Sequence, residues 1–350
     1  MATDFDSILS RMLSNVLGGV AKGEGTFTFD ALAPVALEVS QAYDEIERIK
    51  RVRAGSSEDA TEEEVDMIAA EQGVTRKPAV KSEGTVQLYG PSGTKIPTGS
   101  FATTESGTVF DIQGAATEIP VSGTVSLKIL AQVAGASGNV PAGSISKSSI
   151  PGVTVTNLEE TRGGTDLESK EALLARAIEK RDQPAVSGNP DQYKQTAKTV
   201  PGIFDARVFR GWAGGGTVKV VLISVDKRTP GASAVAAADA LIQAMATTGS
   251  VPTVVGVSEL LVDVSAKLIL VDGGSLDEAR VQVQEAITAY LKALAFTETV
   301  VKLNRIGEAI LSAGNVSDYE YGSLTINGST GNLQLQQDQV PVMGALNLTI

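Results

Sequence analysis

The chain has 350 residues, of which 42% are hydrophobic and 20% charged, and its formal net charge is −12. It contains no cysteine and no histidine, which excludes disulfides, thiolate metal sites and every mechanism that uses an imidazole as base or metal ligand. The acidic balance argues against nucleic acid and anionic membranes as partners, and no apolar run approaches the roughly 20 residues of a membrane span.

Residues 1–80 are predicted to form a helical interaction segment. The first residues are acidic and lack the basic-then-apolar pattern of a signal peptide, so we expect folding in the cytoplasm of the producing cell. A long helix is predicted from Asp30, with apolar residues spaced by four and three, as in a coiled-coil seam: Val35, Val39, Ala42, Ile46 and Ile49. Two interpretations stay open, namely packing on the same chain or entry into a bundle with other subunits.

A further helix is predicted to begin within the acidic run Ser57 to Asp66. Thr61 and Glu64 have the spacing of a capping box, and Gln72-Gly73 supplies a glycine stop. The same run is acidic enough for a divalent cation, but it lacks the spaced ligands and turn glycine of a calcium loop. A solvated, capped helix start is therefore the favoured interpretation.

Residues 81–160 change to short alternating segments bounded by glycine, proline and serine, which predicts an all-β sandwich or barrel. Lys95 to Gly99 and Asn139 to Gly143 read as one turn used twice, with proline at a corner and glycine in the left-handed position. Gly90 to Lys95 superficially resembles a phosphate loop, but a strand follows where a helix is required. Ser144 to Lys147 has Ser-x-x-Lys spacing, yet alternation places it on a strand, where the two side chains do not stack.

Residues 161–256 are predicted to be an α+β unit. Thr165 and Glu168 have capping-box spacing, and Asn189-Pro190 starts a second helix that ends before Val200-Pro201-Gly202. Two strands follow, joined by a glycine-rich loop that contains Trp212, the only tryptophan. Trp212 either covers the hairpin locally or is an exposed contact anchor.

Three further helices are predicted towards the C-terminus. The first spans 232–247, and Ala237, Leu241 and Met245 make one face of it. Residues 257–350 form a second α+β unit, in which a strand over 260–271 precedes a helix that runs from Ser275 through Val281, Ile287 and Leu291 to Leu294. A shorter helix over 303–313 and strands over 316–326 and 340–350 complete it. The predicted fold class is α+β and multidomain, with no catalytic, cofactor or metal site.

The ordered run of these motifs resembles the baseplate J-like family of contractile phage tails and tail-derived particles. The elements that carry the resemblance are Gly163 to Asp166, Glu168 to Arg181, Gly188 to Tyr193, Val200 to Gly202, Trp212 to Gly216 and Val218 to Val225. It extends upstream to Gly135–Ile145 and Gly73–Phe101, and so covers most of the chain.

The resemblance implies a structural wedge subunit of a tail baseplate, a virion or particle component assembled in the bacterial cytoplasm. Expected partners are other copies of itself, neighbouring wedge proteins, the sheath initiator, and hub or tube proteins. The residues predicted to contact partners are Val35, Val39, Ile46, Ile49, Arg210 and Trp212. An alternative is a tail-associated cell-wall or glycan hydrolase, since a chain with 41 acidic residues contains many carboxylate pairs. Against this, no acidic residue stands in an aromatic-rich setting that would bind sugar rings.

Overall fold

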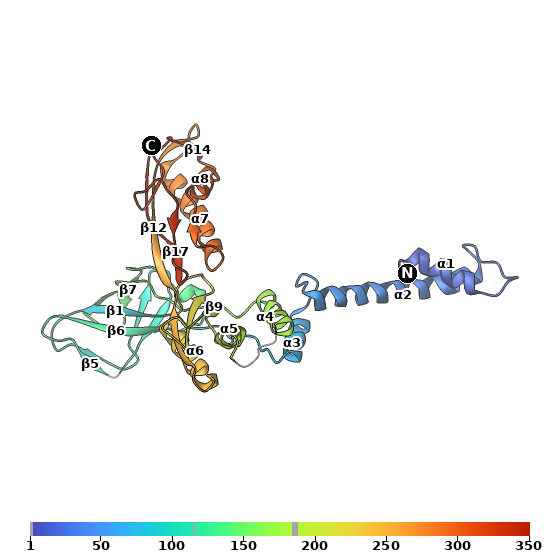
Figure 1. The fold of residues 1–350 in the computed structure, drawn as a ribbon, viewed down its shortest axis with the longest axis horizontal. Coiled ribbons are helices and arrows are strands. Elements are labelled where there is room, and N and C mark those ends of the chain that lie inside the picture. The colour runs from blue at the N-terminus through green and yellow to red at the C-terminus, as the bar shows by residue number, and fades with distance from the viewer. Residues whose placement is uncertain (1–2, 115, 184–187) are drawn as a thin grey trace. The chain divides into compact units, whose positions relative to one another are not determined.

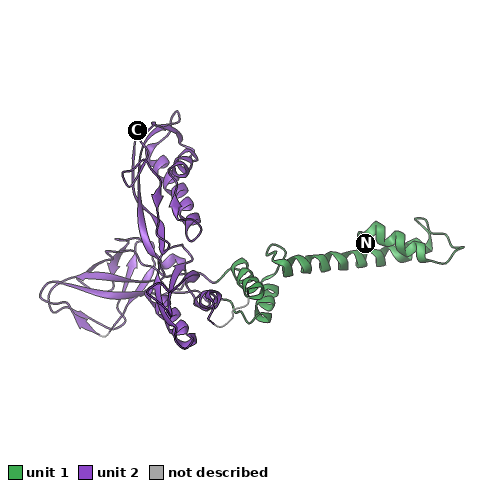
Figure 2. Cartoon of the chain, viewed as in Figure 1, with its two compact units in different colours: residues 1–76, 168–184 green, residues 77–167, 185–350 purple. Residues whose placement is uncertain are grey.

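A computed structural model of the chain describes residues 3–114, 116–183 and 188–350. The chain divides into two units, which Figure 2 distinguishes by colour. The first unit comprises Met1–Arg76 and Glu168–Pro184, and the second comprises Lys77–Leu167 and Ala185–Ile350. Helices and sheets occur as separate blocks along the chain, so the predicted α+β, multidomain fold class is confirmed.

The first unit begins with a helical hairpin of α1 (Phe5–Asn15) and α2 (Phe27–Ala54) (Figure 1). With 28 residues, α2 is about 42 Å long. It starts three residues before the predicted Asp30, because the Thr26 hydroxyl accepts a hydrogen bond from the Phe29 N–H at 3.4 Å and caps the helix there. It ends at Gly55, whose left-handed backbone (φ 114°) favours glycine.

The rest of this unit packs α3 (Glu62–Glu71) and α4 (Lys170–Asp182) against the end of α2. The capping box predicted at Thr61 and Glu64 is confirmed, with both reciprocal hydrogen bonds present. Sequence patterns grouped α4 with the following hairpin unit, whereas in the structure α4 shares its core with α3.

The capping box predicted at Thr165 is wrong. Helix α4 begins later, with the Ser169 side chain accepting from the Ala172 N–H. Residues before it stay extended, because the Thr165 backbone pairs with Val80 and the Asp166 carboxylate accepts from a distant backbone N–H. Contacts far along the chain therefore override a local helix-start signal.

The second unit opens with a barrel-like domain built on a six-stranded antiparallel sheet. Its strand order is β7-β3-β4-β6-β1-β8, and the two end strands, consecutive in sequence, lie against each other and nearly close it. Inward-facing side chains including Leu88, Phe110, Ile129 and Ile145 are fully buried. The bounds are β1 (Glu83–Tyr89), β2 (Lys95–Ile96), β3 (Phe101–Thr104), β4 (Val109–Ile112), β5 (Thr117–Glu118), β6 (Thr124–Ala131), β7 (Ile145–Ser148) and β8 (Thr154–Thr156), with a short 3-10 turn, η1 (Ala136–Gly138).

The turn predicted twice in this domain is confirmed at both places. Gly99 (φ 86°) and Gly143 (φ 76°) are left-handed, and each turn is closed by a hydrogen bond from the following serine N–H to the proline carbonyl. The two turns lead into β3 and β7, which pair with each other. Strand β2 follows Gly93 where a phosphate loop would need a helix, and Lys147 lies on β7, so both stretches have the strand structure predicted for them.

A central α+β domain follows, made of α5 (Pro190–Ala197), β9 (Ile203–Arg210), β10 (Thr217–Ser224), α6 (Ala232–Met245) and β11 (Val251–Gly256). As predicted, Asn189 caps α5 and β9 and β10 form an antiparallel hairpin, and β11 then pairs parallel with β10. Helix α6 buries Ala234, Ala238 and Ile242, whereas on the apolar face noted in the sequence Leu241 is 47% exposed and Met245 is partly buried. Because α6 is apolar on most sides, its periodicity alone did not identify the covered face.

The last domain packs two helices, α7 (Leu276–Leu294) and α8 (Leu303–Leu311), against a sheet. The predicted helix is present, and it buries the row that includes Val283, Ile287 and Leu291, while Val281 is 57% exposed. The long strand β12 pairs parallel with β17 and antiparallel with β14 and β15. The strands are β12 (Ser258–Leu270), β13 (Val300–Val301), β14 (Val316–Tyr319), β15 (Thr325–Ile326), β16 (Leu333–Gln334) and β17 (Gln339–Thr349).

Candidate partner-contact surfaces

Four predicted contact residues lie on α2, and three of them face solvent. Val35, Ile46 and Ile49 are 48%, 46% and 41% exposed, whereas Val39 is partly buried against α1. Ala42, the fifth residue of the seam, is exposed as well. We refer to Val35, Ala42, Ile46 and Ile49 as the α2 seam. The structure therefore leaves an apolar stripe open along about four turns of the helix.

Helix α1 covers a neighbouring face of α2 and not the seam itself. The buried positions of α2 at this interface are Ala36 and Ser40. They directly follow Val35 and Val39, two of the residues predicted for the seam. One residue is a rotation of about 100° around the helix. Consequently α1 packs beside the seam and leaves it free for a further helix.

The core of the α1–α2 hairpin is small for the apolar surface it carries. Its buried apolar residues are Ile8, Leu9 and Ala36, and eight partly buried apolar side chains of the two helices pack around them. Leu17 and Phe27 remain 87% and 89% exposed. The hairpin therefore leaves two large apolar side chains, as well as the α2 seam, open to solvent.

The seam leads towards an apolar surface cavity of about 230 Å³ between α2 and α3. Ile49, Val52, Met67 and Ile68 line it, and Met67 is 61% exposed. Its two carboxylates, on Glu64 and Glu71, form ion pairs with Arg48 and Arg53. The cavity extends the apolar surface and offers no free pair of acids for hydrolysis.

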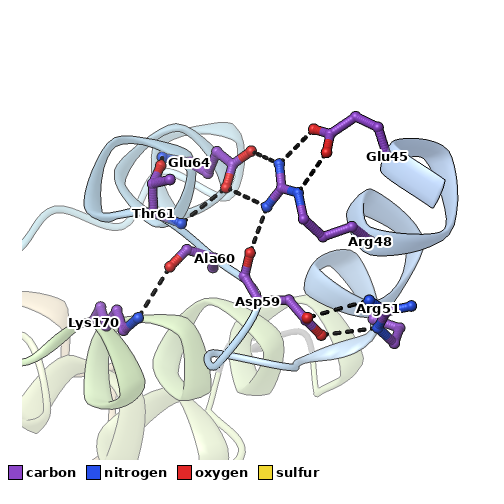
Figure 3. A network of polar contacts seen from close by, with 8 residues as sticks. All are labelled: Glu45, Arg48, Arg51, Asp59, Ala60, Thr61, Glu64 and Lys170. Carbon is purple, nitrogen blue, oxygen red and sulfur yellow. Dashed lines mark hydrogen bonds and ion pairs between the residues drawn. The ribbon is translucent and has the colours of Figure 1, made fainter. Parts of the chain in front are cut away.

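A polar network holds the end of α2 to the start of α3 (Figure 3). Arg48 pairs with Glu45 at 2.7 Å and with Glu64, and its guanidinium also donates to the Asp59 carbonyl. The hydrogen bond from Arg48, together with that from the Thr61 N–H, lowers the pKa of Glu64 to about 2. The network fixes the direction in which α2 leaves the rest of its unit.

The acidic run Ser57 to Asp66 is used in these contacts. Asp59 pairs with Arg51 at 2.9 Å, and Lys170 of α4 donates to the Ala60 carbonyl at 3.0 Å (Figure 3). Glu62 and Asp66 both pair with Arg76. Across residues 3–114, 116–183 and 188–350, no group of three or more acidic side chains is arranged to hold a metal ion.

The remaining predicted contact residues lie at the tip of the β9–β10 hairpin. Trp212 is 49% exposed, and the Lys219 ammonium lies 5.5 Å from its ring centroid. Lys219 also pairs with Asp338 of the last domain at 2.7 Å. Trp212 thus has one local contact on one side and a half-open surface on the other.

Arg210 is exposed and lines a surface cavity of about 320 Å³ beside this hairpin. The other lining residues are glycines, threonines, Pro190, Tyr193, Val208, Val218 and Ser250, with no carboxylate among them. Arg210 and Trp212 lie at the same end of the hairpin. Both residues belong to the second unit, whereas the α2 seam belongs to the first.

An ionic junction that the sequence patterns did not reveal joins the three domains of the second unit. Glu259, at the start of β12, accepts hydrogen bonds from Arg228 at 2.7 Å, Arg162 at 3.1 Å and the Thr229 N–H at 3.0 Å. Glu160 pairs with both arginines at 2.6 Å. Burial raises the pKa of Glu259, but the hydrogen bonds from Arg228 and Thr229 outweigh it and hold this pKa below its ordinary value. No local motif marks these residues, because Arg162 and Glu259 are 97 positions apart.

Within the described ranges, no helix is long and apolar enough to cross a membrane. Three family models match successive parts of the chain: the baseplate J-like protein barrel domain over residues 85–164, the baseplate J-like central domain over 185–257, and the baseplate J-like protein C-terminal domain over 262–349. These matches follow the three domains of the second unit.

Similar proteins come from phages and phage-like elements. The phage-like element PBSX protein XkdT of Bacillus subtilis (strain 168) is 27% identical, over 98% of this chain and 97% of that protein. The baseplate protein gp47 of Escherichia phage Mu is 30% identical over 45% of this chain and 44% of its own length. A chain in the solved baseplate of the anti-feeding prophage covers 97% of both chains, at 12% identity and a TM-score of 0.39. The chain therefore belongs to the baseplate J-like protein family and is a structural subunit of a phage or phage-like baseplate.

Proposed function

We propose that this subunit is a wedge component of a contractile-tail baseplate, which assembles into a ring around the tail hub and couples receptor contact to sheath contraction. Its work is mechanical and not catalytic. The α1–α2 hairpin packs into a helical bundle with other chains, and the second unit links neighbouring wedges. The proposed partners are other copies of the chain, adjacent wedge proteins, the sheath initiator and the hub or tube.

One observation carries this proposal: the α2 seam is an exposed apolar stripe that α1 leaves uncovered. Burying the open halves of Val35, Ile46 and Ile49 against another helix would contribute about 1 kcal/mol each. The polar network around Arg48 gives such a bundle a firm attachment to α3 and α4. A force applied to the hairpin would therefore reach the rest of that unit.

A matched pair of substitutions tests the seam. Ile46 and Leu37 are 46% and 47% exposed on the same helix, but nine residues, or two and a half turns, place them on opposite faces. Ile46→Ser should abolish or sharply reduce assembled tails, counted by electron microscopy of a producing strain. Leu37→Ser should leave the number of tails near wild type. Equal effects of the two changes would contradict the assignment of the seam.

The hydrolase alternative is tested with the purified full chain on cell-wall substrate. The mechanical proposal expects no clearing of the wall at any concentration at which the chain stays soluble. Clearing that persists in the Ile46→Ser variant would establish an enzymatic activity and overturn the proposal.

A further inference from the structure

The barrel domain has no direct covalent link to the two domains that follow it. Both of its chain ends continue into the first unit, which is made of residues 1–76 and 168–184. The two ends pair with each other, since the Glu83 and Arg162 backbones exchange hydrogen bonds of 2.8 and 2.9 Å. Non-covalent contacts therefore hold the barrel against the later domains.

The central and last domains share an apolar core. Val221 and Ile223 of β10 are buried in one cluster with Val340 of β17. The Arg207 guanidinium adds a hydrogen bond to the Gln337 carbonyl at 2.8 Å. Moving one of these domains away from the other would expose their shared apolar surface to water, which opposes such a movement. The two domains therefore behave as one body.

The barrel, by contrast, has a core of its own and reaches this body through charged groups. The apolar cluster around Phe110 contains barrel residues only. Glu160 pairs with Arg228 at 2.6 Å, and Arg162 pairs with Glu259 at 3.1 Å. The side chains of Glu160 and Arg162 are 33% and 39% exposed, so water and salt ions reach both pairs.

Hydrogen bonds at two further places connect the barrel and its entry strand to the central domain. Helix α6 has no side-chain cap of its own, and the Glu83 carboxylate accepts from the Ser233 N–H at 3.2 Å. Lys77, just before the barrel, donates to the Ile203 carbonyl at 2.7 Å. Water can replace a partner in each of these hydrogen bonds at a small net cost. The barrel core stays closed when they break, because its apolar residues pack on one another.

We propose that the barrel is a separate moving body, held against the central and last domains by charged contacts that can open. We call its five side chains the ionic latch: Glu83, Glu160, Arg162, Arg228 and Glu259. When the latch opens, the barrel swings about its paired chain ends, while the central and last domains stay together. Coupling to contraction requires a subunit with two arrangements of similar free energy, so this inference deepens the proposed function and rests on it.

Distances between nitroxide labels on the full chain test the latch. The chain has no cysteine, so an introduced pair of cysteines carries the only two labels. Val121→Cys with Leu241→Cys spans the barrel and the central domain, and Leu241→Cys with Tyr321→Cys spans the central and last domains. These positions are 93%, 47% and 101% exposed. Double electron–electron resonance then gives the distribution of each distance.

The latch variant combines Glu160→Gln with Arg162→Gln, which leaves the net charge unchanged and keeps Arg228 paired with Glu259 at 2.7 Å. It should raise the ratio of open to closed barrel distances about tenfold, because two charge-assisted contacts are lost. Sodium chloride at about 1 M should shift the wild-type barrel distance in the same direction, since it shortens the Debye length to about 3 Å. The distance between the central and last domains should stay the same throughout.

Glu105→Gln with Lys147→Gln is the matched control. It also removes one charge of each sign from the barrel, but this pair is 3.8 Å apart and 81% and 58% exposed. Its barrel distance should match that of the wild type, and circular dichroism should show the same folded content in both variants. Equal opening in the control would overturn the latch. A loss of strand signal in the latch variant would also overturn it, because these charges would then stabilise the barrel fold itself.

The remaining outcomes separate this inference from the proposed function. A barrel distance that neither the latch variant nor salt changes would refute the latch and leave the wedge assignment standing. A distance between the central and last domains that changes as much as the barrel distance would contradict the single body and overturn the inference. The tail counts of Ile46→Ser and Leu37→Ser test the proposed function independently of these distances.

Discussion

Replacing Glu259 with alanine should weaken the junction between the three domains of the second unit. Its carboxylate accepts three hydrogen bonds, from Arg228, Arg162 and the Thr229 N–H, and its side chain is only 13% exposed. The Nε atom of Arg228 is already buried without a partner among the described residues. Glu259→Ala would leave this guanidinium with Glu160 as its remaining counter-ion.

The size of the effect follows from burial. Removing one partner of a fully buried ion pair costs about 3–5 kcal/mol, and partial solvent access to both arginines lowers this to about 2–3 kcal/mol. An exposed ion pair gives the matched control: Glu308 and Arg305 are 64% and 60% exposed. Glu308→Ala should therefore change the free energy of unfolding by less than about 0.5 kcal/mol.

Urea unfolding at neutral pH, followed by tryptophan fluorescence, measures this difference. Trp212 is the only tryptophan and lies in the same central domain as Arg228, so the signal reports on the domain that the junction holds. The Glu259→Ala midpoint should fall well below those of wild type and Glu308→Ala. Free energies of unfolding for the two variants that agree within about 0.5 kcal/mol would refute the reasoning, because the junction would then contribute no more than a surface pair.

Three further outcomes are expected. Arg48 lowers the pKa of Glu64 from 4.5 to about 2, so this contact stabilises the fold above pH 4.5 and is lost as the pH falls towards 2. Hydrogen exchange of the α3 amides should therefore increase over that pH range. A Glu64→Gln variant whose exchange profile is the same as that of the wild type would contradict the linkage. Trp212→Ala should lower the free energy of unfolding by less than about 1 kcal/mol, measured by thermal melts followed by circular dichroism, and should reduce tail assembly. A large loss of stability would instead show that the Trp212 ring packs within its own domain. Gly164→Ala should lower the free energy of unfolding by more than about 2 kcal/mol, because the added Cβ would lie 2.4 Å from a backbone oxygen. Gly215→Ala is the control, since its Cβ would meet nothing within 4 Å, and it should be nearly neutral. Similar melting temperatures for the two variants would show that the backbone around Gly164 relaxes to accommodate the methyl group.

Local signals predicted local structure well. The capping box at Thr61, the proline start of α5 and the two proline–glycine turns depend on residues within a few positions of one another, and all are confirmed. The capping box at Thr165 has the same spacing but failed, because its backbone pairs with Val80 instead. A helix cap stabilises a helix start by only about 1 kcal/mol. Several long-range hydrogen bonds together contribute more than this and therefore decide the local structure.

The exposed surface of α2 was only partly predictable. The spacing of Val35, Ala42, Ile46 and Ile49 indicated an apolar stripe, but periodicity does not say which stripe a neighbouring helix covers. In the structure, α1 packs one residue further round and leaves the stripe open. Helix α6 shows the same limit, because Leu241 of its apolar face is exposed while Ala238 and Ile242 are buried.

By itself, the sequence determined that this chain has no imidazole or thiol chemistry, that it is an α+β protein, and that its ordered motifs match the baseplate J-like family. These conclusions depend on composition and on neighbours along the chain. Only the tertiary structure decided which apolar face of α2 stays uncovered and that Glu259 meets Arg162 and Arg228. Such contacts depend on how segments tens of residues apart in the sequence pack against each other, which short-range periodicity does not encode.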